Sequence, residues 1–196
     1  MGLLIERDDS ILVVVDAQPG FYASAADVGD LDLPTMVERI AWLTGVAAAL
    51  GIPVIVTEED PARNGPTAPV VLDRLPAGSP GPFVKAVFGL AEAPEILGAI
   101  VATGRRTVVI AGFETDVCVA HSALGLLDRG FRVAVVVDAT GSPGQMHVHG
   151  LRRVADAGAT LSHAKGVYYE WVRTLAAARA FEDAHPELAE PPGFSL

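Results

Sequence analysis

Cys118 is the one cysteine in this chain, and its place in the sequence favours reactivity. A β-branched run ends at Ala111-Gly112, and an apolar segment of helical period begins near Asp116. The thiol is therefore expected in the first turn of a helix that rises from the carboxyl end of a strand. Unpaired backbone N–H groups and the helix dipole favour a thiolate there. We predict an unusually acidic, nucleophilic thiol, with a small buried core residue as the alternative.

Two other side chains could act together with this thiol. Asp16 directly follows the apolar run 11–15, and Lys85 stands in the otherwise apolar stretch 82–88. An aspartate after a strand also serves to cap turns, and most lysines are solvated surface charges. An acid, a cation and a thiol together supply a base, a charge stabiliser and a nucleophile. Ligands of open α/β sheets bind beyond the carboxyl ends of the strands, the edge at which Asp16 and Cys118 are expected.

Alternating strand and helix patterns predict how these residues are held. Strands buried on both faces read as continuous apolar runs, and amphipathic helices carry apolar residues three and four positions apart. Strands are expected at 11–15, 52–57, 83–88, 107–111, 132–137 and 159–163, and helices at 34–50, 91–103, 116–128, 145–156 and 168–184. This alternation predicts one α/β domain over residues 1–196, a three-layer α/β/α arrangement with a doubly wound, mostly parallel, Rossmann-like sheet.

Two segments of the chain have no such pattern. Residues 58–82 are rich in proline and glycine and are expected to form a long loop, which in a compact domain is usually functional or mobile. The tail 186–196 is expected to wrap the surface or a partner subunit.

The bulk composition argues against several classes of protein. With 51% hydrophobic residues the chain is not expected to be disordered, and a net charge of −10 without a long basic cluster argues against a nucleic-acid partner. No apolar run is as long as a membrane span, and the first residues lack the basic start and the cleavage site of a signal peptide. A single cysteine excludes an intrachain disulfide, so a reducing, cytoplasmic location is expected.

Several segments together resemble the isochorismatase-like cysteine hydrolases. The resemblance runs from about residue 11 to residue 171 and is carried by Val15-Asp16-Ala17-Gln18-Pro19-Gly20-Phe21, Lys85 and Gly112-Phe113-Glu114-Thr115-Asp116-Val117-Cys118-Val119, with further similar stretches at 131–142 and 153–159. It implies an α/β enzyme with a catalytic triad of Asp16, Lys85 and Cys118. The first and last of these motifs are specific only in combination.

The resemblance also implies a mechanism. Asp16 would take the thiol proton, Lys85 would support both charges, and Cys118 would attack the carbonyl carbon of an amide-like substrate to give a thioester that water hydrolyses. Members of the family usually carry a non-proline cis peptide before the nucleophile, here Phe113–Glu114. That peptide would aim the N–H of Glu114, beside the N–H of Cys118, into an oxyanion hole.

The chain departs from the nicotinamidase branch of this family, which binds a metal through an aspartate and two histidines after the second strand. Residues 57–67 contain no histidine, and the carboxylates Glu58, Glu59 and Asp60 are expected to be solvated loop charges. The segment instead resembles the metal-free, YcaC-related branch, so neither a metal nor another cofactor is expected. His147 and His149 have metal-like spacing, but they point to different sides of a helix and lack a third ligand.

The remaining expectations concern the pocket, the partners and the alternatives. Phe21, Tyr22, His121 and Trp171 are predicted to line the substrate pocket, although aromatic residues are more often core. The partner is expected to be a small molecule, and the resemblance implies a homo-oligomer, a dimer or higher. A metal-independent cysteine hydrolase of a small C–N substrate is the leading interpretation. The alternatives are a catalytically silent oligomeric binding module, a hydrolase of an isochorismate-like vinyl ether, and a thiol redox protein.

Overall fold

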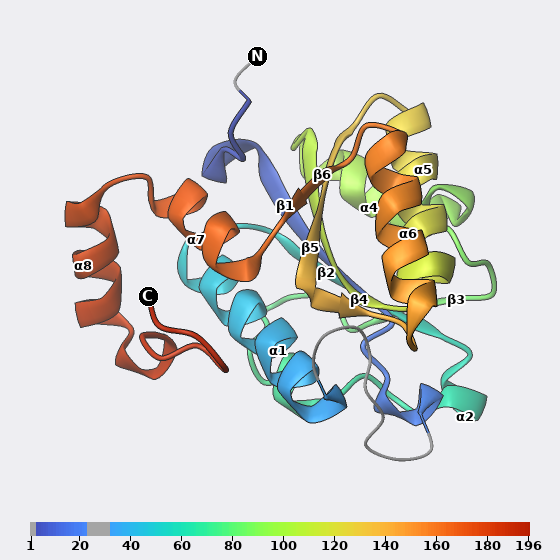
Figure 1. The fold of residues 1–196 in the computed structure, drawn as a ribbon, viewed down its shortest axis with the longest axis horizontal. Helices are drawn as coiled ribbons and strands as arrows, with labels where there is room; N and C mark the ends of the chain where they lie inside the picture. Colours follow the sequence, from blue (N-terminus) through green and yellow to red (C-terminus); the bar gives the residue numbers. More distant parts are fainter. Residues whose placement is uncertain (1–2, 23–31) are drawn as a thin grey trace.

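Six parallel strands form the central layer of the molecule (Figure 1). The computed structural model of the chain describes residues 3–22 and 32–196. The strands are β1 (Ser10–Val15), β2 (Val54–Glu59), β3 (Phe83–Lys85), β4 (Thr107–Phe113), β5 (Arg132–Gly141) and β6 (Thr160–Ser162). They lie in the order β3-β2-β1-β4-β5-β6, and every neighbouring pair is parallel. The predicted doubly wound α/β architecture is confirmed, and its strand order reverses between β1 and β4.

Helices cover both faces of this sheet (Figure 1). The described helices are α1 (Leu33–Ala49), α2 (Pro61–Asn64), α3 (Pro69–Leu72), α4 (Pro94–Ala102), α5 (Ala120–Asp128), α6 (Gln145–Asp156), α7 (Ala164–Val172) and α8 (Leu175–Ala184). One face packs against α1, α7 and α8, and the other against α4, α5 and α6. Side chains of successive residues of β1 point to opposite faces of the sheet. Leu12 and Val14 pack in the core under α1, α7 and α8, and Ile11, Val13 and Val15 pack in the core under α4, α5 and α6. The run 11–15 is therefore buried on both faces, as predicted.

Three expected elements differ from the observed ones. The strand predicted at 83–88 is shorter, because β3 ends at Lys85. The helix predicted at 168–184 is two helices, α7 and α8, because the chain reverses at Arg173 (φ +69°) and Thr174 then caps α8 by accepting a hydrogen bond from the N–H of Ala177. The loop predicted at 58–82 contains the end of β2 and the short helices α2 and α3, each of which begins at a proline.

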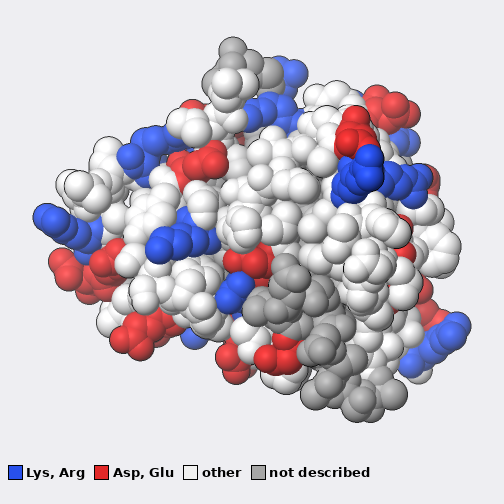
Figure 2. Space-filling view, viewed as in Figure 1, with Lys and Arg blue, Asp and Glu red and all other residues white. Residues whose placement is uncertain are grey.

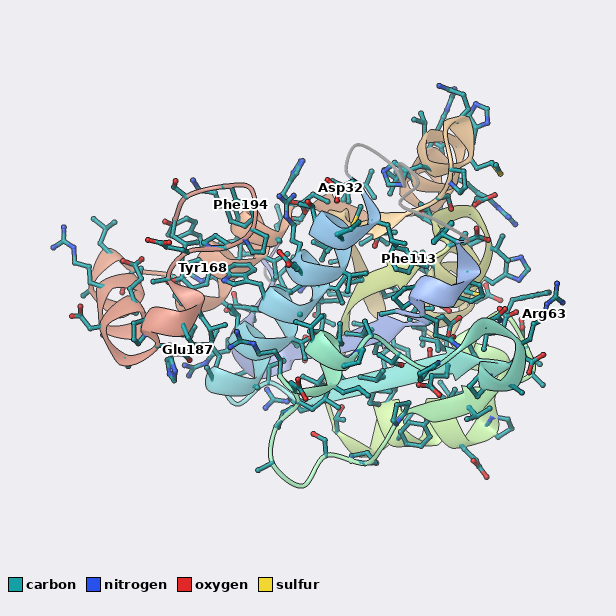
Figure 3. All side chains as sticks on the ribbon, turned by 90° about the horizontal axis from the view of Figure 1, so that it is seen from below. Asp32, Arg63, Phe113, Tyr168, Glu187 and Phe194 are labelled. Atoms are coloured by element: carbon teal, nitrogen blue, oxygen red, sulfur yellow. The ribbon has the colours of Figure 1, made fainter. Side chains whose placement is uncertain are left out.

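The tail packs on α1 of its own chain. The indole of Trp42 donates to the carbonyl of Leu188 (2.8 Å), and the guanidinium of Arg39 donates to that of Pro192. Phe194 lies edge-on to Trp42 (5.5 Å between ring centroids) and 5.0 Å from the Arg39 guanidinium. Figure 3 shows Phe194 and Tyr168 on this side of the molecule, well separated from Phe113. The prediction that the tail wraps the surface is confirmed.

The surface carries mixed charges. On the face shown in Figure 2, basic side chains are interspersed with acidic ones and do not form a continuous basic stripe. Of the helices within residues 3–22 and 32–196, none is long and apolar enough to cross a membrane.

Beside the reversal of strand order, β1 and β4 approach each other unusually closely at Gly112. This residue pairs with Val15 and has φ +120°, a backbone conformation that side chains rarely adopt. A Cβ atom built on Gly112 would lie 1.8 Å from the carbonyl oxygen of Val15. The close contact therefore requires glycine, one residue after the end of the predicted strand 107–111.

We expect Gly112→Ala to lower the free energy of unfolding by more than about 2 kcal/mol, because both the clash and the backbone conformation oppose a side chain. Gly98→Ala is the matched control, since Gly98 lies at an exposed position within α4 with open space around it. The control should raise stability by about 0.5–1 kcal/mol. Urea unfolding of both variants measures the two changes, and equal stability of the two would contradict the argument.

Candidate active site

Asp16 stands at the reversal point, one residue beyond β1, and is completely buried. Its backbone is left-handed (φ +48°), a conformation that aspartate tolerates better than most residues and that is enriched at functional sites. The hydroxyl of Thr57 donates to Oδ1 (2.8 Å), and the ammonium of Lys85 lies 2.6 Å from Oδ2. Burial raises the pKa of the Asp16 carboxyl, although Lys85 and Thr57 act in the opposite direction.

Lys85 is the last residue of β3, the edge strand, and its side chain is fully buried. Besides the ion pair with Asp16, its ammonium donates to the carbonyl of Val87 (3.1 Å) and to the sulfur of Cys118 (3.4 Å). The structure thus brings together Asp16, Lys85 and Cys118 at the carboxyl ends of three different strands, as the sequence led us to expect. A buried charge is tolerated only when it is paired, so the lysine is held in this position by its partners.

Cys118 lies in a π-helical turn, Thr115–Val119, which leads directly into α5. The residue is only 2% exposed, and its thiol donates to Oε2 of Glu59 (Sγ···Oε2 3.0 Å). Burial, together with the charge of Asp16, raises the pKa of the Cys118 thiol, and Lys85 only partly offsets this. The expectation of an unusually acidic thiol is therefore wrong. Cys118 does lie at the start of a helix, but desolvation and the neighbouring carboxylates raise the pKa of the thiol more than the helix start and Lys85 lower it.

Glu59 is a site residue that we had expected to be a solvated loop charge. It is the last residue of β2, pairs with Lys85 across the sheet, and has Oε2 3.9 Å from the lysine ammonium. Its backbone N–H donates to Oε1 of Gln18 (2.7 Å), and the Gln18 amide donates back to its carbonyl. Glu58 is buried and accepts from the N–H of Thr67, so of the three neighbouring carboxylates Glu58 is buried, Glu59 is partly buried and Asp60 is exposed.

A cavity of about 630 Å³ opens beside this group. It is lined by Glu59, Lys85, the turn 60–62 and the segment 84–88. Val84, Val87 and Phe88 are exposed there, so the cavity combines an apolar wall with two carboxylates and one lysine. Such a space has the size and the mixed lining of a small-molecule site.

The turn before Cys118 has the expected backbone. The peptide bond Phe113–Glu114 is cis, which confirms the prediction made for this position. Phe113 is completely buried, and Figure 3 shows it inside the molecule. Tyr22 packs edge-on against Phe113 (5.7 Å) and its hydroxyl donates to Oε1 of Glu114 (3.4 Å), while Phe21 lies beside Tyr22. Desolvation and the charge of Asp116 raise the pKa of the Glu114 carboxyl.

None of the four predicted pocket residues is among those that line this cavity: Phe21 and Tyr22 lie beside the cis peptide, and the other two lie elsewhere. Trp171 is core: its indole donates to the hydroxyl of Ser10, the first residue of β1, whereas Asp16 follows the last residue of that strand. Its assignment to the pocket is therefore wrong, because α7 packs across the opposite end of the strand. His121 packs edge-on against Phe88 (5.8 Å) and lines a separate cavity together with Glu92 and other residues.

The residues offer little to a metal ion. Single ligand atoms of Asp16, Glu59 and Cys118 lie within 4.8 Å of one another. However, the ammonium of Lys85 stands among them, at 2.6, 3.9 and 3.4 Å, so a positive charge already occupies the place of a cation. His147 is buried against the hydroxyl of Thr115 (2.9 Å), whereas His149 is exposed, so these two histidines do not form a pair.

Comparison with known proteins gives a consistent family. A family model described as "Isochorismatase domain" matches residues 10–165. The "Isochorismatase domain-containing protein 2" of Xenopus laevis is 35% identical over 170 residues, which cover 85% of this chain and 77% of that protein.

Two solved structures share the fold over nearly the whole chain. The YcaC gene product of Escherichia coli, described as an octameric hydrolase of unknown specificity, has a TM-score of 0.81 at 26% identity and covers 96% of this chain and 94% of its own. YcaC from Pseudomonas aeruginosa, solved with hexane-2,5-diol and covalent acrylamide, has a TM-score of 0.81 at 27% identity and covers 96% of this chain and 95% of its own.

We expect Lys85→Ala to destabilise the fold by about 3–5 kcal/mol, because it leaves the buried carboxylate of Asp16 without its partner. The same change should slow alkylation of Cys118 by iodoacetamide at any given pH. Lys85 lowers the pKa of the thiol, so its loss raises that pKa further and reduces the thiolate fraction.

Thermal melts and a pH series of alkylation rates measure both effects. Lys165→Ala serves as the control, since Lys165 is an exposed lysine that donates to the carbonyl of Ser195, and should cost less than about 1 kcal/mol. The wild-type rate should reach half its maximum well above pH 8.5, roughly the value for a free cysteine. A stable, rapidly alkylated Lys85→Ala variant would show that the lysine does not support this site.

Proposed function

The chain belongs to the isochorismatase family, and on that premise we propose that it is a metal-independent cysteine hydrolase of a small amide-like substrate. The observation that carries the proposal is the buried ammonium of Lys85, which lies 2.6 Å from Asp16 and 3.4 Å from the sulfur of Cys118. A core thiol has no need of a buried cation and two carboxylates around it. A nucleophilic thiol does need such charged groups, because its negative charge must be formed and stabilised during the reaction.

The proposed reaction has two stages. The thiolate of Cys118 attacks the carbonyl carbon, the C–N bond breaks, and a thioester forms. Water then hydrolyses the thioester and restores the thiol. Lys85 stabilises the thiolate in both stages, and a carboxylate beside the sulfur takes the thiol proton, a role that the family resemblance gives to Asp16. The raised pKa of Asp16 suits a proton acceptor, since its basicity then lies nearer neutral pH.

The oxyanion of each tetrahedral intermediate needs hydrogen-bond donors. We assign this role to the backbone N–H groups of Glu114 and Cys118, which belong to the cis peptide and to the π-helical turn at the carboxyl end of β4. Such fixed donors contribute roughly 3–4 kcal/mol to a transition state when each is well aimed.

The cavity beside Lys85 and Glu59 supports a small substrate. Its volume of about 630 Å³ is within the range of small-molecule sites. YcaC from Pseudomonas aeruginosa, whose structure covers 96% of this chain, was solved with covalent acrylamide, a molecule of the compact size proposed here.

Cys118→Ala should abolish formation of an acyl-enzyme on any amide that the wild type hydrolyses, because the thioester needs the sulfur. Asp16→Asn should keep substrate binding but lower kcat by about 10²–10⁴. Mass spectrometry of the protein after rapid mixing with a panel of small amides detects the adduct, and steady-state kinetics give the rates. Hydrolysis that persists in Cys118→Ala would disprove the covalent mechanism. An amide panel that leaves no adduct and no product on the wild type would favour a silent binding module.

We further propose that the chain assembles into a homo-oligomer. The YcaC gene product of Escherichia coli, described as octameric, covers 96% of this chain with a TM-score of 0.81. Val84, Val87 and Phe88 leave apolar side chains 63%, 36% and 50% exposed on one segment, which is the kind of surface that association buries.

Light scattering coupled to gel filtration should therefore report a multiple of the chain mass of 20.4 kDa at micromolar concentration. Association should also weaken in a Val84→Asp variant, whereas Leu175→Asp, at an exposed leucine of α8, tests whether any added charge has this effect. A mass of one chain for the wild type would contradict the proposal.

A further inference from the structure

The cavity beside Lys85 presents carboxylates to a ligand, but no available cation. Of the described residues that line it, Glu59 and Asp60 are acidic and Lys85 alone is basic. The Lys85 side chain is fully shielded from solvent, and its ammonium is already bound by Asp16 (2.6 Å) and by the carbonyl of Val87 (3.1 Å). The Glu59 side chain is 25% exposed, and Asp60 is exposed. Among these lining residues a ligand therefore meets accessible carboxylates but no accessible ammonium.

The arginine that comes next in the chain does not alter this balance. Arg63 directly follows the turn 60–62, but it is exposed and is not one of the residues that line the cavity. Figure 3 shows it at the outer edge of the molecule. Proteins usually hold a carboxylate or a phosphate with an arginine fork or with a free lysine ammonium. The described lining of this cavity offers neither, so it is poorly suited to an anionic ligand.

Two further carboxylates lie at the start of the turn that carries Cys118. Glu114 and Asp116 are partly buried, and within the described residues neither forms an ion pair. Desolvation, and then the charges of Asp116 and Glu59, raise the pKa of the Glu114 carboxyl, so these groups act on one another across the site. The net charge of −10 on the whole chain adds to this field, which attracts cations and repels anions.

The rest of the cavity lining is apolar. Val84, Val87 and Phe88 are 63%, 36% and 50% exposed there, which gives an alkyl chain a surface to pack on. The face of an aromatic ring such as that of Phe88 attracts a cation and does not attract an anion. The cavity thus fits a short apolar chain that ends in a positive charge.

We propose that the substrate is a small amide that carries a positive charge at the end of a short alkyl chain, and that an anionic amide of the same length is rejected. The inference rests on the proposed hydrolase function and deepens it by naming the substrate class. The carbonyl would lie at Cys118, whose sulfur is 3.4 Å from the Lys85 ammonium at the cavity wall, and the charged end would lie near Glu59 and Asp60. Hydrolysis of a primary amide of this class consumes one water, replaces the C–N bond by a C–O bond, and gives a carboxylate and ammonium.

Three primary amides with the same alkyl chain test the charge directly. 4-Aminobutanamide is a cation, pentanamide is neutral and glutaramate is an anion. Their kcat/KM values should fall in that order, with the cation ahead of the anion by about 10–100-fold. Pentanamide separates attraction of the cation from rejection of the anion. Added salt should narrow the ratio, since charges at an exposed rim are screened.

A matched pair of variants locates the effect in this cavity. Asp60→Asn removes one carboxylate from the wall, and asparagine tolerates the left-handed backbone at this position (φ +38°). It should reduce the ratio of cation to anion by about 3–10-fold. Asp183→Asn makes the same change at an exposed aspartate of α8, which lies on the opposite side of the molecule from β3 and α2 (Figure 1), and should leave the ratio unchanged. An unchanged ratio in Asp60→Asn would overturn the placement of the charged end in this cavity.

The single cysteine allows a second test that needs no hydrolysis. Cys118 is treated with the 2-aminoethyl, methyl and 2-sulfonatoethyl esters of methanethiosulfonate, which are cationic, neutral and anionic thiol reagents. Each rate is divided by the rate with 2-mercaptoethanol, which removes the intrinsic reactivity of the reagent. After this correction the cationic reagent should modify Cys118 at least about 10-fold faster than the anionic one.

The two tests separate failure of the substrate class from failure of the hydrolase. Glutaramate turned over as fast as 4-aminobutanamide, or equal corrected rates for the cationic and anionic reagents, would overturn the substrate class and leave the hydrolase standing. A preference for the cationic reagent without hydrolysis or a Cys118 adduct from any amide would instead overturn the proposed hydrolase.

Discussion

The buried ion pair between Lys85 and Asp16 is the constraint on which the rest of the site depends. Both side chains are fully shielded from solvent and their charged atoms are 2.6 Å apart. Removing two charges from water costs several kcal/mol per ion, which only a close partner and further hydrogen bonds can offset. Thr57 and the carbonyl of Val87 supply these bonds, so the edge strand β3 is tied to the centre of the sheet. The ammonium of Lys85 is thereby held beside the sulfur of Cys118.

The sheet topology explains why these groups meet. The strand order reverses between β1 and β4, where the following segments part to opposite faces and leave a crevice at the carboxyl edge. Two backbone features shape this edge: the left-handed Asp16 and the side-chain-free Gly112, which lets β4 approach the carbonyl of Val15. Both features position the groups of the site. A bulky residue in place of Asp16 or Gly112 would shift the backbone at the ends of β1 and β4, and with it the surroundings of Cys118.

The sequence patterns were sufficient for most of the strands, and the family resemblance for the cis peptide and for the proximity of Asp16, Lys85 and Cys118, but neither was sufficient for the whole site. Apolar runs such as 11–15 identify strands because burial on both faces leaves little choice of residue. The direction of a side chain at a strand end depends on register and on the turn that follows, which no local pattern encodes. Glu59 was therefore indistinguishable from Asp60, although one contacts the thiol and the other is solvated. The assignment of Trp171 to the pocket was wrong for a related reason, because its position along α7 places it at the amino end of β1.

The charges around Cys118 also decide when the thiol reacts. Asp16 and Glu59 bring two carboxylates to one ammonium, so ionisation of the thiol would place a third negative charge beside Lys85. Burial adds to this cost, and the pKa of the resting thiol is raised as a result. A raised pKa keeps the sulfur protonated and thus poorly reactive toward oxidants, which attack the thiolate. In the proposed reaction the thiolate forms only when its proton passes to a neighbouring carboxylate, a role that the family resemblance gives to Asp16, so ionisation and attack on a bound carbonyl substrate would be coupled.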